Sequence, residues 1–192
     1  MTKAIRITGE EPGAFFQHRP VVATIVTARA RGKDNALAIG LHTLISHNPP
    51  ICGIAVMPEK FTYELITESK EFGVNFMPFE EVKLVCAVGT STGREIDKFQ
   101  KFNIAKDKSV RTEVPILKSA YAAYECKLID DRGYGSHRWL VGDIVAVHWL
   151  KEVYTPENTL DLDKISPILF LGRNVYLTTS KDSTRNIGRI IH

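Results

Sequence analysis

The chain has 192 residues, 44% of them hydrophobic and 24% charged, and its formal net charge of +3 comes from interspersed acids and bases. This length allows one domain with a sizeable core, and the weak, scattered charge does not favour binding to nucleic acid. No stretch approaches the roughly 20 apolar residues of a membrane-spanning helix, and the first residues lack the apolar core of a signal peptide.

The three cysteines, Cys52, Cys86 and Cys126, show no C-x-x-C spacing, and two of them sit in apolar, strand-like runs. This usage is typical of buried, reduced thiols, so we expect a cytoplasmic protein without a membrane segment. We expect residues 1–192 to form a single domain, in which 1–18 are an N-terminal lead-in and 177–192 a C-terminal tail.

Residues 21–28 read V-V-A-T-I-V-T-A, and this run of β-branched side chains predicts a strand. Residues 29–34 are polar and basic, with Gly32 near the centre, which indicates a hairpin loop. Two further strands are expected between residues 35 and 56, joined through the H-N-P-P sequence at 47–50.

Large and small side chains alternate along the first of these two strands, and successive side chains of a strand point to opposite faces. The large ones predict a core face, whereas the small ones predict a face that a ligand or another backbone approaches closely. The next strand repeats the pattern, with Gly53 and Ala55 on its small side. The core face would consist of Leu37, Ile39, Leu41 and Ile45, and the small-residue face of Ala36, Ala38, Gly40 and His42.

The rest of the chain shows short helical and extended patterns. Hairpins outnumber β-α-β units, so we predict an antiparallel, barrel-like sheet with helices on the outside. The expected elements are helices over 60–69 and 79–88, strands over 71–77, 122–130 and 137–150, a tight turn at 131–136 and an ordered surface loop at 97–103.

Several catalytic signatures are missing from the sequence. There is no G-x-G-x-x-G, no G-x-x-x-x-G-K-[ST] and no G-x-S-x-G motif. His42 and His47 match no familiar metal-ligand spacing, so we expect no metal site.

Lys60 and Thr62 open the helix that follows the two strands, where free backbone N–H groups favour an anion. A surface of small residues that ends at a basic helix start would suit a planar ring carrying a phosphate. The alternative is an ordinary helix cap with a solvated lysine. Arg29, Arg31 and Lys33 could bind a second phosphate or could form a solvated hairpin tip.

Four other polar side chains allow two interpretations each. His42 could touch the edge of a ring, or it could be a hydrogen-bonded, half-buried histidine within a sheet. Thr43 and Ser46 could donate hydroxyl hydrogen bonds to a ligand, or they could belong to the turn that follows. His137 could face a pocket at the start of its long strand, or it could lie in water.

Six segments of the sequence, taken in the order in which they occur, are together similar to those of a known protein family. They are R-P-V-V-A-T-I-V-T (19–27), N-A-L-A-I-G-L-H-T-L-I-S-H-N-P-P (35–50), P-E-K-F-T-Y-E-L-I-T-E-S-K-E-F-G-V-N (58–75), E-I-D-K-F (95–99), Y-G-S-H-R-W-L-V-G-D-I-V (134–145) and G-R-N-V-Y (172–176). Together they resemble the flavin reductase-like FMN-binding split-barrel family, which includes flavoredoxins and the small reductase components of two-component monooxygenases. The resemblance runs from about Arg19 to about Tyr176.

The resemblance implies a mainly β fold with short helices, namely a six-stranded split β-barrel with Greek-key character. It also implies a homodimer with FMN bound near the subunit interface. His137 matches the histidine of a glycine-acid-histidine turn near the flavin and nicotinamide, although Ser136 replaces the usual acid. The implied ring and ribityl contacts are Asn35, Ala36, Leu37, His42, Thr43, Leu44 and Ser46, and the implied phosphate-side residues are Lys60, Thr62 and Tyr63.

The implied function is an FMN-dependent oxidoreductase that takes hydride from NADH or NADPH and passes electrons to free flavin, a ferric chelate or a redox partner protein. The cofactor would carry the chemistry, so no side chain need act as a nucleophile. Two alternatives remain: a flavoredoxin-like electron carrier that NAD(P)H does not reduce directly, and a non-catalytic flavin-binding module.

Overall fold

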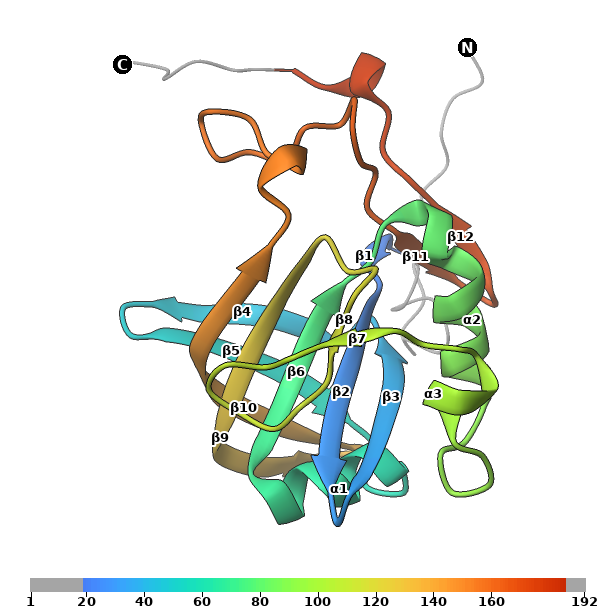
Figure 1. Cartoon of the computed structure of the whole chain (residues 1–192), viewed down its shortest axis with the longest axis vertical. Helices are drawn as coiled ribbons and strands as arrows, with labels where there is room; N and C mark the ends of the chain where they lie inside the picture. Colours follow the sequence, from blue (N-terminus) through green and yellow to red (C-terminus); the bar gives the residue numbers. More distant parts are fainter. Residues whose placement is uncertain (1–18, 186–192) are drawn as a thin grey trace, which may run out of the picture.

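The structure, a computed structural model, describes residues 19–185. The predicted lead-in at 1–18 and the last residues of the predicted tail, 186–192, lie outside the described residues. Within the described part the protein is mainly β with a few short helices, as the sequence predicts (Figure 1).

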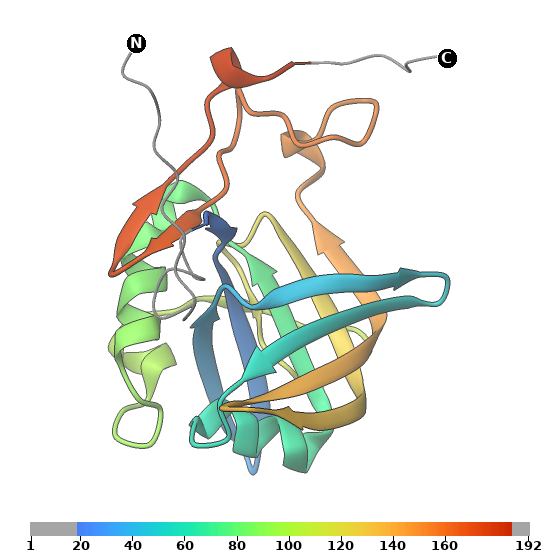
Figure 2. The same cartoon turned by 180° about the vertical axis from the view of Figure 1, so that it is seen from behind.

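A seven-stranded antiparallel sheet forms the body of the molecule. It curls into an open barrel, which Figures 1 and 2 show from opposite sides. The strand order is β3-β2-β6-β9-β10-β5-β4. The strands are β2 (Thr24–Ala30), β3 (Lys33–Ile39), β4 (His42–His47), β5 (Pro50–Val56), β6 (Glu71–Phe76), β9 (Ala122–Tyr134) and β10 (His137–Trp149).

The two edge strands of this sheet, β3 and β4, are consecutive in the chain. The sequence predicts one continuous strand here, but the chain breaks at Gly40 and Leu41 and crosses from one edge of the sheet to the other. A Cβ atom on Gly40 would lie 2.6 Å from Val21 Cγ2, and the Leu41 carbonyl accepts a hydrogen bond from Ala55 N at 2.9 Å. The predicted split barrel is therefore confirmed, and one of its strands is divided in two.

The barrel interior holds the main hydrophobic core. One end is covered by helix α1 (Phe61–Ser69), whose Leu65 and Ile66 are fully buried. Burying each such side chain contributes roughly 1.5–3 kcal/mol relative to leaving it exposed. The core also includes Val26, Ala28, Leu37, Cys52, Ile54, Phe72, Val74, Cys126 and Leu140.

A second core lies outside the barrel, between β3 and helix α2 (Val82–Thr90). Ala36 is fully buried there with Val85 and Val88, and a Cβ atom on Gly89 would lie 3.3 Å from the Ala38 Cβ. At Ala36 the small-residue face is therefore covered by a helix, whereas Ala38 and Gly40 line a cavity of about 170 Å³ beside that helix. The expectation that a ligand lies directly on this face at Ala36 is wrong, because the close approach comes from α2 instead.

The predicted core face is correct on β3 and wrong beyond it, at Leu41 in the break and at Ile45 on β4. Leu37 is buried inside the barrel, whereas Leu41 and Ile45 are 46% and 48% exposed. Figure 2 shows the turn end of the hairpin formed by β4 and β5 projecting from the barrel as a two-stranded arm, while β5 stays paired with β10 over Ile51–Val56. We refer below to residues 42–56 as the β4–β5 arm.

The predicted surface loop at 97–103 contains a short helix, α3 (Lys98–Lys101). The Asp97 side chain caps it by accepting a hydrogen bond from Gln100 N at 3.0 Å. Among the described residues no helix is both long and apolar enough to cross a membrane. The remaining elements are β1 (Val21–Val22), β7 (Lys106–Asp107), β8 (Ile116–Leu117), β11 (Leu169–Gly172), β12 (Val175–Leu177), and the 3₁₀ turns η2 (Phe79–Glu81), η3 (Lys151–Val153) and η4 (Lys181–Ser183).

Candidate functional site

A cavity of about 210 Å³ opens where helix α1 begins. Four parts of the chain surround it: strand β3, the turn that leads from β5 into α1, the loop that follows α2, and the start of α3. We call it the α1 cavity. Its lining residues are Asn35, Leu37, Met57, Glu59, Lys60, Phe61, Thr62, Ser91, Thr92, Gly93 and Lys98.

The start of α1 presents free backbone donors to this cavity. Lys60 is the N-cap residue, with an extended backbone (φ −72°, ψ 133°), and its side chain makes no capping hydrogen bond. The first N–H groups of any α-helix lack acceptors within the helix, and they carry partial positive charge. Phe61 and Thr62 supply these groups at the edge of the cavity.

Asn35 is held in place from two sides at the wall of the cavity. Its Nδ2 donates a hydrogen bond to Thr62 Oγ1 at 2.8 Å, and both side chains are buried. On the other side the backbone of Gly93 packs against it, so that a Cβ atom on Gly93 would lie 2.1 Å from Asn35 Oδ1. Glycine at position 93 therefore lets the loop after α2 reach the start of α1.

Lys98 is a buried cation beside the same cavity, with 2% of its surface exposed. Its ammonium group donates to two backbone carbonyls, Ala36 O at 2.8 Å and Val88 O at 2.7 Å. Within residues 19–185 no carboxylate forms an ion pair with it. Burial, with a smaller effect from the positive charge of Lys60, lowers the pKa of Lys98 to about 8. Lys60 and Lys98 thus line a cavity in which Glu59 is the one acid among the lining residues.

The basic hairpin tip is already neutralised by carboxylates. Arg31 pairs with Glu64 at 2.6 Å and with Glu68 at 3.0 Å, and Arg29 pairs with Asp34 at 2.7 Å. Of the two interpretations of the tip, the structure favours the solvated surface turn, because these guanidinium groups are occupied. Lys33 is exposed in the same hairpin.

A second cavity, of about 330 Å³, contains His137 and is lined by Ala55, Tyr134, His137 and Trp139. The Trp139 indole lies over Gly53, where a Cβ atom would be 2.2 Å from Trp139 Cζ2. The Ser136 hydroxyl is hydrogen-bonded to His137 Nδ1 at 2.9 Å. We call this the Trp139 cavity.

The outer face of β5 connects the two cavities. Side chains alternate along a strand, so Gly53, Ala55 and Met57 lie in one row at the end of β5. Ala55 lines the Trp139 cavity and Met57 lines the α1 cavity. On β5, Ala55 therefore borders open space and Gly53 lies beneath Trp139. On β3 and in the break after it, Ala38 and Gly40 line a further cavity of about 170 Å³.

Several sequence-predicted residues lie away from both cavities. His42 packs edge-on against Phe76, with ring centroids 5.9 Å apart, and its Nε2 lies 2.9 Å from Val22 O. Burial lowers the pKa of His42, so the structure favours the half-buried sheet histidine. The Tyr63 hydroxyl donates to Asp131 at 2.9 Å, on another side of α1. Thr43, Leu44 and Ser46 lie on the β4–β5 arm.

The α1 cavity thus brings together Asn35, Leu37, Lys60 and Thr62 from the sequence prediction, while His137 occupies the neighbouring cavity. Sequence reasoning missed the residues of the loop after α2 and the buried lysine. The run G-T-S-T-G-R at 89–94 is a signal that could have identified the loop, because small and hydroxylated residues at a helix end commonly form polar contacts. The missed residues are Met57, Ser91, Thr92, Gly93 and Lys98.

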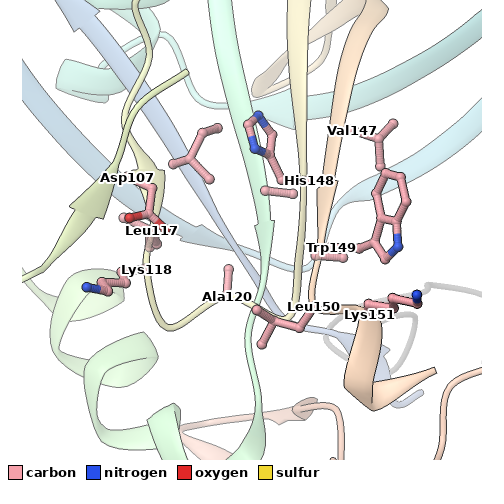
Figure 3. Close-up of a pocket in the computed structure, with 12 residues that line it drawn as sticks. Asp107, Leu117, Lys118, Ala120, Val147, His148, Trp149, Leu150 and Lys151 are labelled. Carbon is pink, nitrogen blue, oxygen red and sulfur yellow. The ribbon is translucent and has the colours of Figure 1, made fainter. Parts of the chain in front are cut away.

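A third cavity, of about 480 Å³, lies between the end of β10 and the segment around β7 and β8 (Figure 3). Trp149 and Leu150 line it from β10 and the residue that follows, and Asp107 and Lys118 from the other side. None of the sequence-predicted site residues lines it.

Comparison with known proteins identifies relatives of this chain. A family model described as flavin reductase like domain matches residues 16–186. An uncharacterized protein of Aeropyrum pernix is 30% identical over 170 residues, which cover 83% of this chain and 63% of that protein. The match therefore spans less than two thirds of that relative's length.

Two further matches are to proteins whose descriptions name an activity or a bound cofactor. A ferric-chelate reductase (NAD(P)H) of Archaeoglobus fulgidus is 26% identical over 129 residues, covering 67% of this chain and 75% of that protein. The crystal structure of an FMN-binding protein from Thermus thermophilus with bound 1-cyclohex-2-enone superposes with a TM-score of 0.82. That match is 29% identical in sequence and covers 96% of this chain and 100% of the other.

Proposed function

Because this chain belongs to the flavin reductase like domain family, we propose that it binds FMN and transfers electrons from NADH or NADPH to an acceptor. The observation that carries this proposal is the α1 cavity, which combines a helix N-terminus with two ammonium groups and few opposing charges. Such a site is suited to a phosphate.

The residues of the α1 cavity fit the phosphate end of FMN. Lys60 and the N–H groups that begin α1 would bind phosphate oxygens, and the hydroxyl groups of Ser91 and Thr92 would add neutral donors. Asn35 would fix the positions of Thr62 and of the loop that contains Gly93 around the ligand. Preorganised donors of this kind reduce the entropy that binding costs.

The ring would then be held along the outer face of β5, which leads from Met57 past Ala55 to Trp139. Bound FMN supplies hydride and electron transfer chemistry at this place. The protein's part is to orient the ring, to limit the access of water and to provide a surface for the nicotinamide beside His137. The relative from Archaeoglobus fulgidus, named as a ferric-chelate reductase (NAD(P)H), supports the choice of donor.

Anaerobic reduction tests this proposal and separates it from the electron-carrier alternative. Purified protein is loaded with FMN, excess flavin is removed, and the visible absorbance is followed after NADH or NADPH is added. Fast bleaching supports the oxidoreductase. Bleaching by dithionite but not by either nucleotide would favour the carrier, and failure to retain any flavin would overturn the assignment.

We also propose that the protein acts as a homodimer. The supporting observation is that both the β4–β5 arm and the end of β10 carry exposed apolar side chains, beyond the last pair between β5 and β10, Ile51 with Asp143. Exposed apolar surface commonly marks interfaces. The residues are Leu44 and Ile45 on the arm and Val147, Trp149 and Leu150 at the end of β10, of which Trp149 is 58% exposed.

The cytoplasm remains the proposed location. The three cysteines are free thiols, and Cys52 and Cys126 are buried in the barrel core. Reduced cysteines of this kind are typical of proteins in a reducing compartment. The proposed acceptors are a small molecule, such as free flavin or a ferric chelate, or a redox partner protein.

A further inference from the structure

We propose that Arg94 makes the α1 cavity selective for FMN over FAD, the dinucleotide that joins FMN to an adenylate, by closing the outlet through which the adenylate would leave the cavity. This inference rests on the proposed function, because it assigns a specificity role to a residue beside the same site. It goes beyond that function by predicting which flavin the protein rejects and which side chain rejects it.

The α1 cavity is too small for a whole dinucleotide. Its volume is about 210 Å³, whereas pockets that enclose drug-sized ligands measure roughly 300–1,000 Å³. Space of this size suits a phosphate with the adjoining end of a ribityl chain. The second phosphate and the adenosine of FAD would therefore have to extend out of the cavity.

Buried side chains close the inner wall of the cavity. Asn35 and Thr62 are buried and hydrogen-bonded to each other, and Lys98 is buried beside the same cavity. In the proposed binding mode the flavin ring extends past Met57. A longer phosphate chain would therefore leave on the other side of the mouth, between the start of α1 and the loop after α2. The exposed lining residues are Met57, Glu59, Lys60 and Thr92.

Arg94 bridges the loop and the helix at this outlet. Gly93 and Phe61 both line the cavity, and Arg94 follows Gly93 in the chain. Its guanidinium carbon lies over the Phe61 ring, 5.5 Å from the ring centroid. Its Nη1 also donates to Glu64 Oε2 at 2.9 Å, three residues further along α1. The Arg94 side chain thus connects the two sides of the outlet directly outside the cavity lining.

Glu64 holds Arg94 in this position. The second carboxylate oxygen of Glu64, Oε1, accepts a hydrogen bond from Arg31 Nη2 at 2.6 Å, so Glu64 joins the β2–β3 hairpin to the loop after α2. Hydrogen bonds from Arg31 and Arg94 lower the pKa of Glu64, which keeps the carboxylate ionised at neutral pH. Because Arg94 already has a carboxylate partner, its role is to close the site rather than to bind the FMN phosphate.

The adenylate of FAD would have to displace Arg94 from Phe61. Displacement breaks one cation–π contact and one exposed ion pair, and together these correspond to roughly tenfold in an equilibrium constant. FMN ends at its phosphate and leaves Arg94 in place. A preference for FMN over FAD of about this size follows.

Calorimetric titration of flavin-free protein with FMN, FAD and riboflavin tests the inference. We expect the wild-type protein to bind FMN about tenfold more tightly than FAD. Arg94→Ala should bind FAD about as tightly as FMN, because FAD gains affinity while the Kd values for FMN and riboflavin stay near those of wild type. If the variant instead loses affinity for FMN but not for riboflavin, Arg94 binds the phosphate and the proposal is wrong.

Two further variants locate the effect. Arg94→Lys keeps the positive charge but lacks the planar guanidinium group that lies over Phe61, so it should also gain affinity for FAD. Arg31→Ala is the matched control, because Arg31 pairs with the same Glu64 carboxylate from the β2–β3 hairpin. It should keep the wild-type preference for FMN.

The outcomes separate this inference from the proposed function. If wild-type protein binds FMN and FAD equally well, or if the preference for FMN persists in both Arg94 variants, the role of Arg94 is wrong while the flavin assignment stands. If none of the three flavins binds, the proposed function fails and this inference fails with it. Should Arg94→Ala not fold, the wild-type preference and the affinity of Arg94→Lys for FAD still decide.

Discussion

At the scale of single residues, the candidate site depends on a glycine and an amide that touch each other. Gly93 and Asn35 approach so closely that any side chain at position 93 would displace the Asn35 side chain. Asn35 in turn donates to Thr62, the second residue of α1. The geometry of the helix start thus depends on the absence of one Cβ atom.

Gly93→Ala should therefore weaken FMN binding by about tenfold or more, because a lost or distorted hydrogen bond to a charged ligand costs about 1.5–3 kcal/mol. Fluorescence titration of FMN measures the effect. Gly133→Ala is the control, since its Cβ atom would meet only Arg138 Nη1, the end of a flexible side chain, at 3.3 Å. Equal affinities for the two variants would show that Asn35 does not position the ligand.

At the residue level, the helix start singles out Lys60 and Thr62, and the family resemblance adds Asn35. All three line the α1 cavity. Lys98 could not be found in this way, because D-K-F-Q-K reads as a polar surface segment. Its burial depends on the packing of α3 against β3 and α2, which no short-range pattern encodes.

At the scale of secondary-structure elements, the small residues of β3 and β5 serve different purposes. Ala36 on β3 makes room for α2, and Ala38 and Gly40 line a cavity of about 170 Å³. On β5, Gly53 lies beneath Trp139 and Ala55 lines the Trp139 cavity. The same sequence pattern therefore indicated a close approach correctly in both strands. It could not distinguish a helix from a ligand as the approaching partner.

Ala36→Val tests the role assigned to β3. Because Ala36 is fully buried against α2, the added bulk should lower the free energy of unfolding by about 1–3 kcal/mol. Urea denaturation of the flavin-free protein measures this, with the exposed Ala105→Val as the control. If the free energy of unfolding is unchanged and FMN binding is lost, the small-residue face of β3 contacts the ligand at Ala36, contrary to the role assigned here.

The β4–β5 arm carries the proposed dimer contact. Ile45→Glu combined with Trp149→Glu places two charges in a group of apolar side chains that a partner subunit would bury. We expect this double variant to be a monomer in analytical ultracentrifugation at a concentration where the wild type is a dimer. A wild-type protein that sediments as a monomer at micromolar concentration would contradict the dimer proposal.

At the scale of the whole molecule, a buried carboxylate joins the barrel to the long segment that crosses its outside. Glu125 on β9 is fully buried and accepts hydrogen bonds from Val110 N at 2.7 Å, from Arg111 N and Thr112 N at 2.8 Å, and from His148 Nε2 at 2.7 Å. Burial alone raises the pKa of Glu125, but these hydrogen bonds outweigh it and hold the pKa below its ordinary value.

A lowered pKa makes this contribution to stability depend on pH. It is fully present above the pKa of the unfolded chain, about 4.3, and it is lost as pH falls through the lower pKa of the folded state. Glu125→Gln should therefore lower the free energy of unfolding at pH 7 by about 1.5–3 kcal/mol, and the difference from wild type should shrink in acid. Urea denaturation at pH 7 and at pH 3 tests this, and a constant difference would refute it.

The overall architecture was largely predictable from the sequence, because alternating β-branched strands and hairpin turns carry a strong local signal. The strands at 71–77 and 137–150 appear close to their expected bounds. The expected strand at 21–28 is divided into β1 and β2, which belong to different sheets, and the expected turn at 131–136 is strand as far as Tyr134. The break at Gly40 and the projecting arm were not predictable from local patterns. Both arise because the chain bends between β3 and β4 and crosses from one edge of the sheet to the other, which closes the barrel. Leu41 and Ile45 continue an apolar alternation that is equally suited to a core and to an interface.

The most direct test of the account compares FMN with riboflavin in Lys60→Ala and wild-type protein at pH 7. If the α1 cavity binds the flavin phosphate, the variant should bind FMN about tenfold or more weakly, and its Kd for riboflavin should equal that of wild type. Equal losses for both ligands, or no loss for either, would contradict the assignment of this cavity to the phosphate.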